Sequence, residues 1–188
     1  MTVAEYLSDA ARLLERMATS PAADQVEEAV VRIAEALSAR RPLLVCGNGG
    51  SASDAMHITG ELVGRFLKER KALKAICLSS NPAVLTAWSN DYSFETVFAR
   101  QVEAYGEASG VLLGISTSGN SGNVVEAFRT ARDIGMTTVG LTGAGGGKLA
   151  LLSDVLIDVP SRHTPEIQQV HICLYHYICE AVEARCAS

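Results

Sequence analysis

The sequence predicts an α/β fold, a three-layer sandwich with a five-stranded parallel sheet preceded by N-terminal helices. Two observations lead to this prediction. Short apolar runs alternate with helical segments between residues 42 and 185, and continuous apolar strands are typical of parallel sheets covered by helices on both faces. The chain also has 188 residues, of which 48% are hydrophobic and 20% charged. This is enough for one domain with a sizeable core.

Two helices are expected ahead of the sheet. The first opens with Thr2-Val3-Ala4-Glu5, a capping-box pattern in which the threonine hydroxyl and the glutamate carboxylate satisfy the first backbone N–H groups. Apolar residues then recur at helical spacing as far as Met17. A second helix is expected over residues 22–38, because its apolar residues fall on one face.

The expected strands are apolar runs of strand length, at residues 43–46, 75–78, 111–115, 137–141 and 155–159. The expected helices around them are residues 52–66, 82–88, 94–105, 123–133, 148–152 and 165–185. In open parallel sheets, ligands bind outside the carboxyl ends of the strands. The loops that follow the strands are therefore where a site is expected, and loops 79–81 and 116–121 are rich in hydroxyl and amide groups.

The loop Ser116-Thr117-Ser118-Gly119-Asn120-Ser121 is the main candidate for an anion site. It follows a strand and precedes a helix, so backbone N–H groups and the positive end of the helix dipole meet there. Ser, Asn and Gly also form ordinary capped turns. Because four hydroxyls occur in six residues, we favour an anion cradle whose hydroxyls donate to phosphate oxygens over a plain capped turn.

Two glycine-rich loops resemble nucleotide motifs without completing them. Residues 46–52 match G-x-G-x-x-A, but that motif expects an acid about 20 residues on, and the second strand ends in Ser79-Ser80-Asn81. We therefore reject a nicotinamide cofactor. Residues 143–148 look like a P-loop, but Thr142 and Leu149 stand where Gly and Ser/Thr are required. This loop is interpreted as a glycine turn.

His57 and Glu61 form a candidate chemical pair. They are four residues apart on the helix after the first glycine loop, so their side chains share a face. An imidazole and a carboxylate near an anion site could ligate a metal or transfer protons, and an exposed surface pair is an equal alternative. Gln168 and His176 lie eight residues apart on the last helix, a rise of about 12 Å, so their spacing alone is weak support for a shared ion.

Composition excludes several other classes. The net charge is −5, so no nucleic-acid partner is expected. One segment concentrates basic residues, which we interpret as solvated surface: Arg65, Lys68, Arg70, Lys71 and Lys74. No apolar run approaches the roughly 20 residues of a membrane helix, and the N-terminus lacks a signal-peptide pattern. The five cysteines include no C-x-x-C pair, which favours buried free thiols in the cytoplasm.

Five ordered segments resemble the phosphoheptose isomerase family, whose members share the sugar isomerase (SIS) fold, a flavodoxin-like arrangement. They are CGNGGSASDAMHITGELVGRF (46–66), SNDYSF (89–94), LLGISTSGNSGNVVEAF (112–128), GMTTVGLTGAGGGKL (135–149) and TPEIQQVHICLYH (164–176). The likeness covers most of residues 40–185 without large gaps.

The resemblance implies a specific reaction and assembly. Family members convert D-sedoheptulose 7-phosphate to D-glycero-D-manno-heptose 7-phosphate by enediol proton transfer, the first step of nucleotide-activated heptose biosynthesis for surface polysaccharides such as lipopolysaccharide. They are homotetramers with active sites at subunit interfaces, and members bind zinc, which implies one ion per subunit. Residues 1–188 would then form a single SIS domain, with helices 1–38 used in oligomer packing and residues 42–185 as the α/β core.

The resemblance also implies site residues. The family's metal ligands fall on His57, Glu61, Gln168 and His176. Its substrate contacts fall on Asn48, Gly49, Gly50, Ser51, Glu61, Arg65, Asn90, Asp91, Ser116, Thr117, Ser118, Ser121 and Gln168. Glu61 and His176 occupy the acid–base positions, and we assign Glu61 as the carbon base, although the reverse assignment stays open.

Some positions depart from the family pattern, and other functions were weighed. The departures include Asn81, Glu166 and Gln169, and they bear on substrate detail more than on reaction type. The alternatives are a non-catalytic SIS protein that binds the replication initiator, a sugar-phosphate-sensing regulator and an isomerase for another phosphosugar. The initiator-binding relative lacks the acid–base Glu and the late His, so Glu61 and His176 favour the enzyme.

Overall fold

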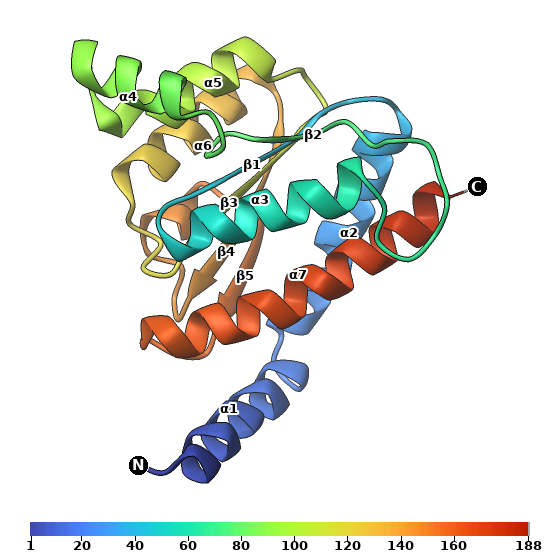
Figure 1. Ribbon diagram of the computed structural model, residues 1–188, viewed down its shortest axis with the longest axis vertical. Helices are drawn as coiled ribbons and strands as arrows, with labels where there is room; N and C mark the ends of the chain where they lie inside the picture. Colours follow the sequence, from blue (N-terminus) through green and yellow to red (C-terminus); the bar gives the residue numbers. More distant parts are fainter. Residues whose placement is uncertain (188) are drawn as a thin grey trace.

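The computed structural model describes residues 1–187 and contains a parallel sheet between two layers of helices (Figure 1). Its strands are β1 Leu43–Gly47, β2 Ala75–Cys77, β3 Val111–Ser116, β4 Thr137–Gly143 and β5 Val155–Val159. They lie in the order β2-β1-β3-β4-β5, and every neighbouring pair is parallel. The chain therefore leaves β1 and β3 in opposite directions, which makes the gap between their carboxyl ends a topological switch point.

The helices are α1 Val3–Ala18, α2 Ala22–Ser38, α3 Gly50–Val63, α4 Pro82–Asp91, α5 Val97–Tyr105, α6 Gly122–Ile134 and α7 Thr164–Cys186, with 3-10 turns η1 Phe94–Thr96 and η2 Gly147–Leu151. Helices α2, α3 and α7 cover one face of the sheet, and α5 and α6 cover the other. The predicted three-layer α/β fold is confirmed.

The core consists of two apolar layers that share the sheet. Leu43 and Val45 pack with α2, α3 and α7, whereas Leu44 and Cys46 pack with α5 and α6. This alternation arises because successive side chains of a strand point to opposite faces. All five residues of β1 are buried, which is the pattern expected for a central parallel strand.

Four predicted helices differ from the structure by more than one residue or in type. The helix expected over 82–88 continues to Asp91, so Asn90 and Asp91 lie at the end of α4. The helix expected over 52–66 spans Gly50–Val63 and ends at Gly64, whose ψ of −111° is not helical. Arg65 therefore lies beyond the helix. The helix expected over 94–105 begins as the 3-10 turn η1, where the Ser93 hydroxyl accepts from the Glu95 N–H. The segment at 148–152 is also a 3-10 turn, η2, rather than an α-helix.

The interpretation of the basic segment 65–74 as solvated surface is wrong for one residue. Lys68, Lys71 and Lys74 are exposed, but the Arg70 side chain is only 1% exposed and pairs with Glu183. A buried guanidinium requires such a carboxylate partner from elsewhere in the fold, and sequence spacing gave no sign of one 113 residues away.

The prediction of buried free thiols is correct in part. All five cysteines are free, Cys46 and Cys179 are buried, and Cys173 is exposed. Burial raises the pKa of the Cys179 thiol to about 12, which makes this thiol unreactive at neutral pH. Cys173 lies in the same apolar helix as Cys179 but on its outer side, a distinction that depends on how α7 is rotated against the sheet.

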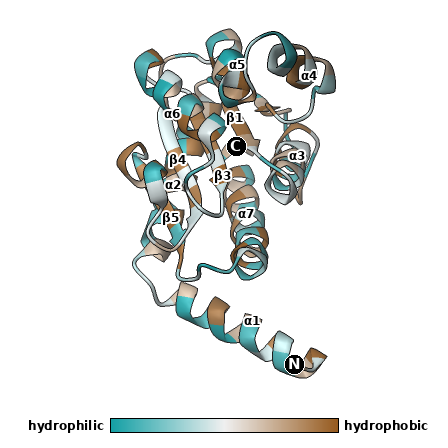
Figure 2. Ribbon diagram, turned by 90° about the vertical axis from the view of Figure 1, so that its left-hand side faces the viewer, coloured by the Kyte–Doolittle hydropathy of each residue, from teal (hydrophilic) through white to brown (hydrophobic). Residues whose placement is uncertain are grey.

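Helix α1 projects from the rest of the molecule (Figure 2). The predicted capping box is present, with Thr2 accepting from the Glu5 N–H and Glu5 accepting from the Thr2 N–H. Leu13 and Met17 are buried at its C-terminal end, whereas Leu7 is 62% exposed. The use of residues 1–38 in oligomer packing stays a prediction. No helix within residues 1–187 is both long and apolar enough to cross a membrane.

Candidate active site

The predicted anion turn lies between the end of β3 at Ser116 and the start of α6 at Gly122. Ser121 is the N-cap residue of α6, and its hydroxyl lies 2.9 Å from that of Ser116. The Ser118 hydroxyl accepts from the Asn120 N–H at 3.1 Å. Hydroxyls and the free N–H groups of the first turn of α6 therefore gather at one helix N-terminus, an arrangement suited to a phosphate.

The glycine loop at 143–148 supports this turn from behind. Gly119 has a φ of +66°, and a Cβ there would overlap the carbonyl oxygen of Gly146. The Asn120 side-chain oxygen accepts from the Lys148 N–H at 3.1 Å. Gly146 itself has a φ of +67°. The interpretation as a glycine turn is confirmed, and the turn's role is to let two backbones approach closely.

Asn48 and Asn123 join the loop after β1 to the first turn of α6. Each amide nitrogen donates to the other side chain's oxygen at 2.9 Å, and Asn123 is buried. The pair spans the switch point between β1 and β3. The sequence predicted Asn48 as a substrate contact but did not single out Asn123. An amide in the first turn of the helix after the serine-rich loop is the signal that could have identified it.

Helices α3 and α7 run side by side and in the same direction. At their N-terminal ends, a Cβ on Gly50 would clash with Nε2 of Gln168. Further along, His57 contacts Tyr175, and beyond α3 Phe66 contacts Glu183, at separations of 118 and 117 residues. The Thr164 hydroxyl at the start of α7 lies 3.5 Å from that of Thr117. Both helices therefore begin at the phosphate edge of the sheet.

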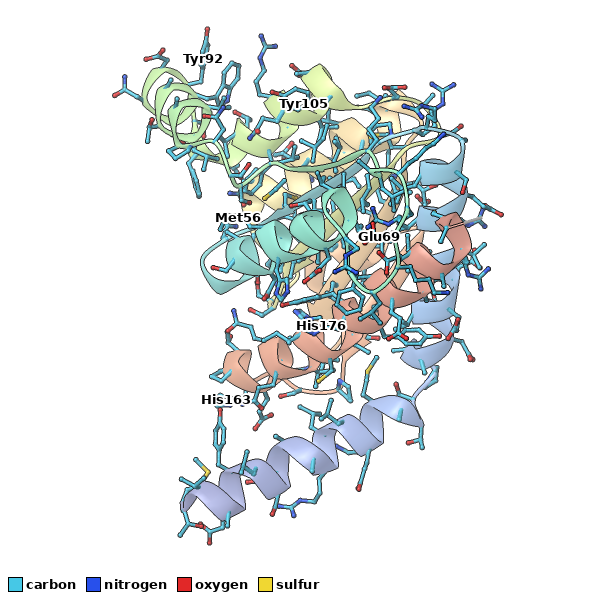
Figure 3. The ribbon with its side chains drawn as sticks, turned by 45° about the vertical axis from the view of Figure 1, so that its right-hand side comes forward. Met56, Glu69, Tyr92, Tyr105, His163 and His176 are labelled. Carbon is cyan, nitrogen blue, oxygen red and sulfur yellow. The ribbon has the colours of Figure 1, made fainter. Side chains whose placement is uncertain are left out.

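A cluster of chemical groups lies where these two helices meet, and we call Asp54, His57, Glu61, Tyr175 and His176 the α3–α7 cluster. His57 Nε2 lies 3.0 Å from Glu61 Oε1, and its Nδ1 lies 3.0 Å from the Tyr175 hydroxyl. The rings of His57 and His176 are 5.0 Å apart. The His57 and Glu61 side chains are 42% and 23% exposed, so the cluster is partly open to solvent. His176 marks its place in Figure 3, between α3 and α7.

Buried groups support the accessible ones. Burial, and next the Asp54 charge and hydrogen bond, raise the pKa of Tyr175 to about 12, so its hydroxyl keeps its proton. Burial also raises the pKa of Asp54. His57 thus meets Glu61 at Nε2 and the Tyr175 hydroxyl at Nδ1, and Tyr175 in turn bonds Asp54. Sequence reasoning missed the roles of Tyr175 and Asp54, which only the packing of α7 on α3 brings together.

The donor types in the cluster suit zinc. Imidazole nitrogen and carboxylate oxygen are common zinc ligands, and the Tyr175 bond to Nδ1 is the kind of outer contact that orients a ligating histidine. Within residues 1–187, no three His, Cys, Asp or Glu side chains converge closely enough to enclose an ion as they stand. Gln168 lies beside Gly50, two turns before His176. The residues fit zinc in chemistry, while its binding stays a prediction.

Other predicted site residues lie outside the cluster. Arg65 is exposed and pairs with Glu69 at 3.3 Å. The Asn90 amide donates to Asp91 at 2.9 Å at the end of α4, far from the cluster in Figure 3, where Tyr92 and His176 mark the two places. Ser51 is buried in the first turn of α3 and packs against Gly47. One chain therefore does not bring Asn90 and Asp91 to the proposed acid–base groups.

The fold and the anion turn are those expected of a SIS-domain protein, and the sequence comparisons agree. The family model of the SIS domain matches residues 5–143. Phosphoheptose isomerase from Crocosphaera subtropica is 54% identical over 160 residues, covering 85% of this chain and 82% of that protein.

Two solved structures are similar over nearly the whole chain. A phosphoheptose isomerase from Francisella tularensis has a TM-score of 0.92 and 33% identity, covering 98% of this chain and 100% of that one. The enzyme from Neisseria gonorrhoeae has a TM-score of 0.87 and 38% identity, covering 97% of both chains. The chain belongs to the phosphoheptose isomerase family of SIS-domain proteins, and it is an isomerase.

Proposed function

We propose that this isomerase converts D-sedoheptulose 7-phosphate to D-glycero-D-manno-heptose 7-phosphate. The observation that carries the proposal is the contact of Glu61 with His57, beside His176, on two helices that both begin at the phosphate edge of the sheet. Aldose–ketose exchange requires a base for a carbon-bound proton and a second group for hydroxyl protons. A carboxylate and imidazoles within one cluster supply both.

The phosphate is held by the turn Ser116–Ser121, with Asn48, Gly49 and Gly50 on the facing loop. Glu61 removes a proton from C1 of the ketose, and the electron pair of that bond forms the enediol as the C2 oxygen takes up a proton. Delivery of a proton to C2, with loss of the proton on O1, completes the aldose. His176 exchanges the hydroxyl protons. The pair can also act with the two roles reversed.

We also propose one zinc ion per subunit, held by His57, Glu61, Gln168 and His176. When bound, zinc would polarise the substrate carbonyl and favour the enediolate. The chain's own contribution is the orientation of His57 by Tyr175, whose hydroxyl lies 3.0 Å from Nδ1. This bond leaves Nε2 directed toward Glu61.

We further propose a cytoplasmic homotetramer that starts nucleotide-activated heptose biosynthesis. Two features support sites at subunit interfaces. Helix α1 exposes Val3 and Leu7 at 76% and 62%, which is an apolar surface suited to a second copy. The end of α4, which carries Asn90 and Asp91 beside Tyr92, lies away from His176 of the α3–α7 cluster in the same chain (Figure 3), so a neighbouring subunit is the natural place for them to act.

The decisive experiment is incubation with sedoheptulose 7-phosphate in D2O. We expect an aldose 7-phosphate that carries deuterium at C2, because an enediol must be reprotonated there from an exchanging base. Ketose phosphates with five or six carbons serve as competing substrates. Faster turnover of one of these would reassign the substrate, and an unlabelled product would contradict an enediol with an exchanging base.

The assignment of Glu61 is tested by Glu61→Gln, which keeps the shape and removes the base. We expect turnover to fall by roughly 100-fold or more, with the assembly unchanged in size-exclusion chromatography. Near-normal turnover in this variant would show that Glu61 is not the base. Metal analysis of the purified protein is expected to find about one zinc per chain, as a single four-ligand site implies.

A further inference from the structure

Glu183 and Arg70 form an ion pair that is almost completely buried. Their side chains are each 1% exposed, and Arg70 Nε lies 3.2 Å from Glu183 Oε1. Removing two charges from water is costly, and an apolar pair of similar size is often at least as stable. Stability alone therefore does not explain the pair, and the hydrogen bonds that it makes indicate its structural role.

The Glu183 carboxylate holds the turn that follows α3. It accepts from the backbone N–H groups of Phe66, Leu67 and Lys68, at 2.9, 2.6 and 2.8 Å. Burial alone would raise the pKa of Glu183, but these three donors and Arg70 outweigh it and lower the pKa below its usual value. The charged carboxylate thus ties three consecutive residues of the connection to the C-terminal part of α7, which the connection crosses in Figure 1.

The Arg70 guanidinium holds the end of α3 itself. Its Nη2 donates to the backbone carbonyl of Glu61 at 2.8 Å, and its Nη1 donates to that of Gly64 at 3.2 Å. The last carbonyls of a helix have no partner within the helix, so Arg70 acts as a C-terminal cap. Glu61, whose carbonyl Arg70 binds at the shortest of these distances, is the residue that we assign as the carbon base.

The same turn carries an aromatic ring to the second proposed acid–base group. Phe66 lies over His176 with ring centroids 6.0 Å apart and an interplanar angle of 19°. The Phe66 backbone is the first of the three groups that Glu183 holds. His176 is thereby contacted by His57 on one side and by Phe66 on another.

We propose that Glu183 and Arg70 are positioning residues, which fix the turn of α3 that carries Glu61 and the Phe66 ring that packs on His176. The assignment of Glu61 and His176 as the groups positioned rests on the proposed function. Neither Glu183 nor Arg70 touches the reacting atoms. Their effect is to hold the relation between two helices, and small displacements of acid–base groups reduce turnover strongly.

The test compares Glu183→Gln with Glu180→Gln in the purified full-length protein. The first change keeps the shape of the side chain but removes its charge, while Glu180 is an exposed carboxylate one turn away on the same helix. For Glu183→Gln we expect kcat for sedoheptulose 7-phosphate to fall roughly tenfold or more. KM should stay within about twofold, because the phosphate turn is on a different part of the sheet. Glu180→Gln should keep the wild-type values.

A second readout does not depend on activity. The chain has four histidines, so their ring resonances can be resolved by NMR after labelling with 13C-histidine. In Glu183→Gln the His176 resonance should shift, since its stacking on Phe66 changes, while those of His163 and His171 should not. If the wild-type protein had no heptose isomerase activity, the proposed function would be contradicted. The His176 resonance would still show whether the Glu183–Arg70 pair positions this ring.

Two results would overturn the proposal. One is a Glu183→Gln variant that matches Glu180→Gln in both kcat and the His176 resonance. The other comes from a second variant, Phe66→Leu, which also serves if Glu183→Gln does not fold. Phe66→Leu leaves the ion pair and the three backbone bonds intact but removes the ring from His176, and it should lower kcat. Wild-type kcat in Phe66→Leu would show that the turn positions nothing of importance to the reaction.

Discussion

The side-chain amides of Asn48 and Asn123 hydrogen-bond each other in both directions, at 2.9 Å each. The pair crosses the switch point between β1 and β3, where open parallel sheets bind their ligands. It therefore holds two loops of the proposed phosphate site at a fixed separation, although the two residues are 75 positions apart in the chain.

Replacing Asn123 by Asp should weaken substrate binding. The carboxylate can accept from Asn48 but cannot donate to it, and it adds a negative charge beside the N-terminus of α6 where the phosphate binds. We expect KM to rise by roughly tenfold or more, the effect of about 1–3 kcal/mol. Asn123→Ala, which loses the bonds without adding the charge, should show a smaller rise. Equal KM values for the two variants would mean that the charge is not felt by the substrate.

Replacing Gly119 by Ala should disrupt the phosphate turn. The φ of +66° is unfavourable for alanine, and the new Cβ would overlap the Gly146 carbonyl oxygen. Gly145→Ala is the matched control, because Gly145 has a φ of +83° but open space around it. The control should lose about 1–2 kcal/mol. We expect Gly119→Ala to lose more in urea unfolding and to raise KM, and equal losses would show that the overlap is relieved without cost.

Replacing Tyr175 by Phe should reduce turnover with the fold intact. The change removes the hydroxyl that lies 3.0 Å from His57 Nδ1, and loss of such an orienting partner typically costs about 10–100-fold in activity or metal affinity. Tyr177→Phe, on the exposed side of the same helix, should keep wild-type kinetics. If Tyr175→Phe also kept wild-type kcat and zinc affinity, the orientation of His57 would not depend on this bond.

His171 should make the protein less stable in weak acid. Burial, partly offset by the contact with the Thr142 carbonyl, lowers the pKa of His171 from 6.5 to about 4. The folded state keeps the ring neutral while the unfolded chain takes up a proton. The free energy of unfolding is therefore at its full value above the unfolded pKa of 6.5. It decreases as the pH falls toward 4, by about 2 kcal/mol at pH 5.

Urea unfolding at pH 7.5 and pH 5 tests this linkage. His171→Leu should remove about 2 kcal/mol of the difference in unfolding free energy between the two pH values. His163→Gln, a change at a histidine whose side chain is 67% exposed, should leave the difference as it is in the wild type. A pH dependence that His171→Leu does not alter would assign the acid sensitivity to other groups.

Local patterns in the sequence predicted most of the framework. Each strand was predicted from a mainly apolar run of four or five residues, and the chain's order of elements then implied a parallel sheet. The turn Ser116–Ser121 was predicted for the same reason, since its hydroxyls and the helix after it are contiguous. The end of α3 was placed three residues too late, because the break at Gly64 depends on contacts that Arg70 makes with the last carbonyls.

What the sequence by itself determined is thus the fold class, the site's edge of the sheet and the candidates His57 and Glu61, all of which follow from short-range spacing. Only the tertiary structure decided that Tyr175 orients His57, that Asn123 holds Asn48, and that Arg70 is buried against Glu183 instead of solvated. These contacts join residues 75 to 118 positions apart. The contacts of Tyr175 and Arg70 depend on how α7 packs on α3, and the Asn48–Asn123 contact depends on how the loop after β1 meets α6. The combined packing of the core sets both, and no local pattern records them.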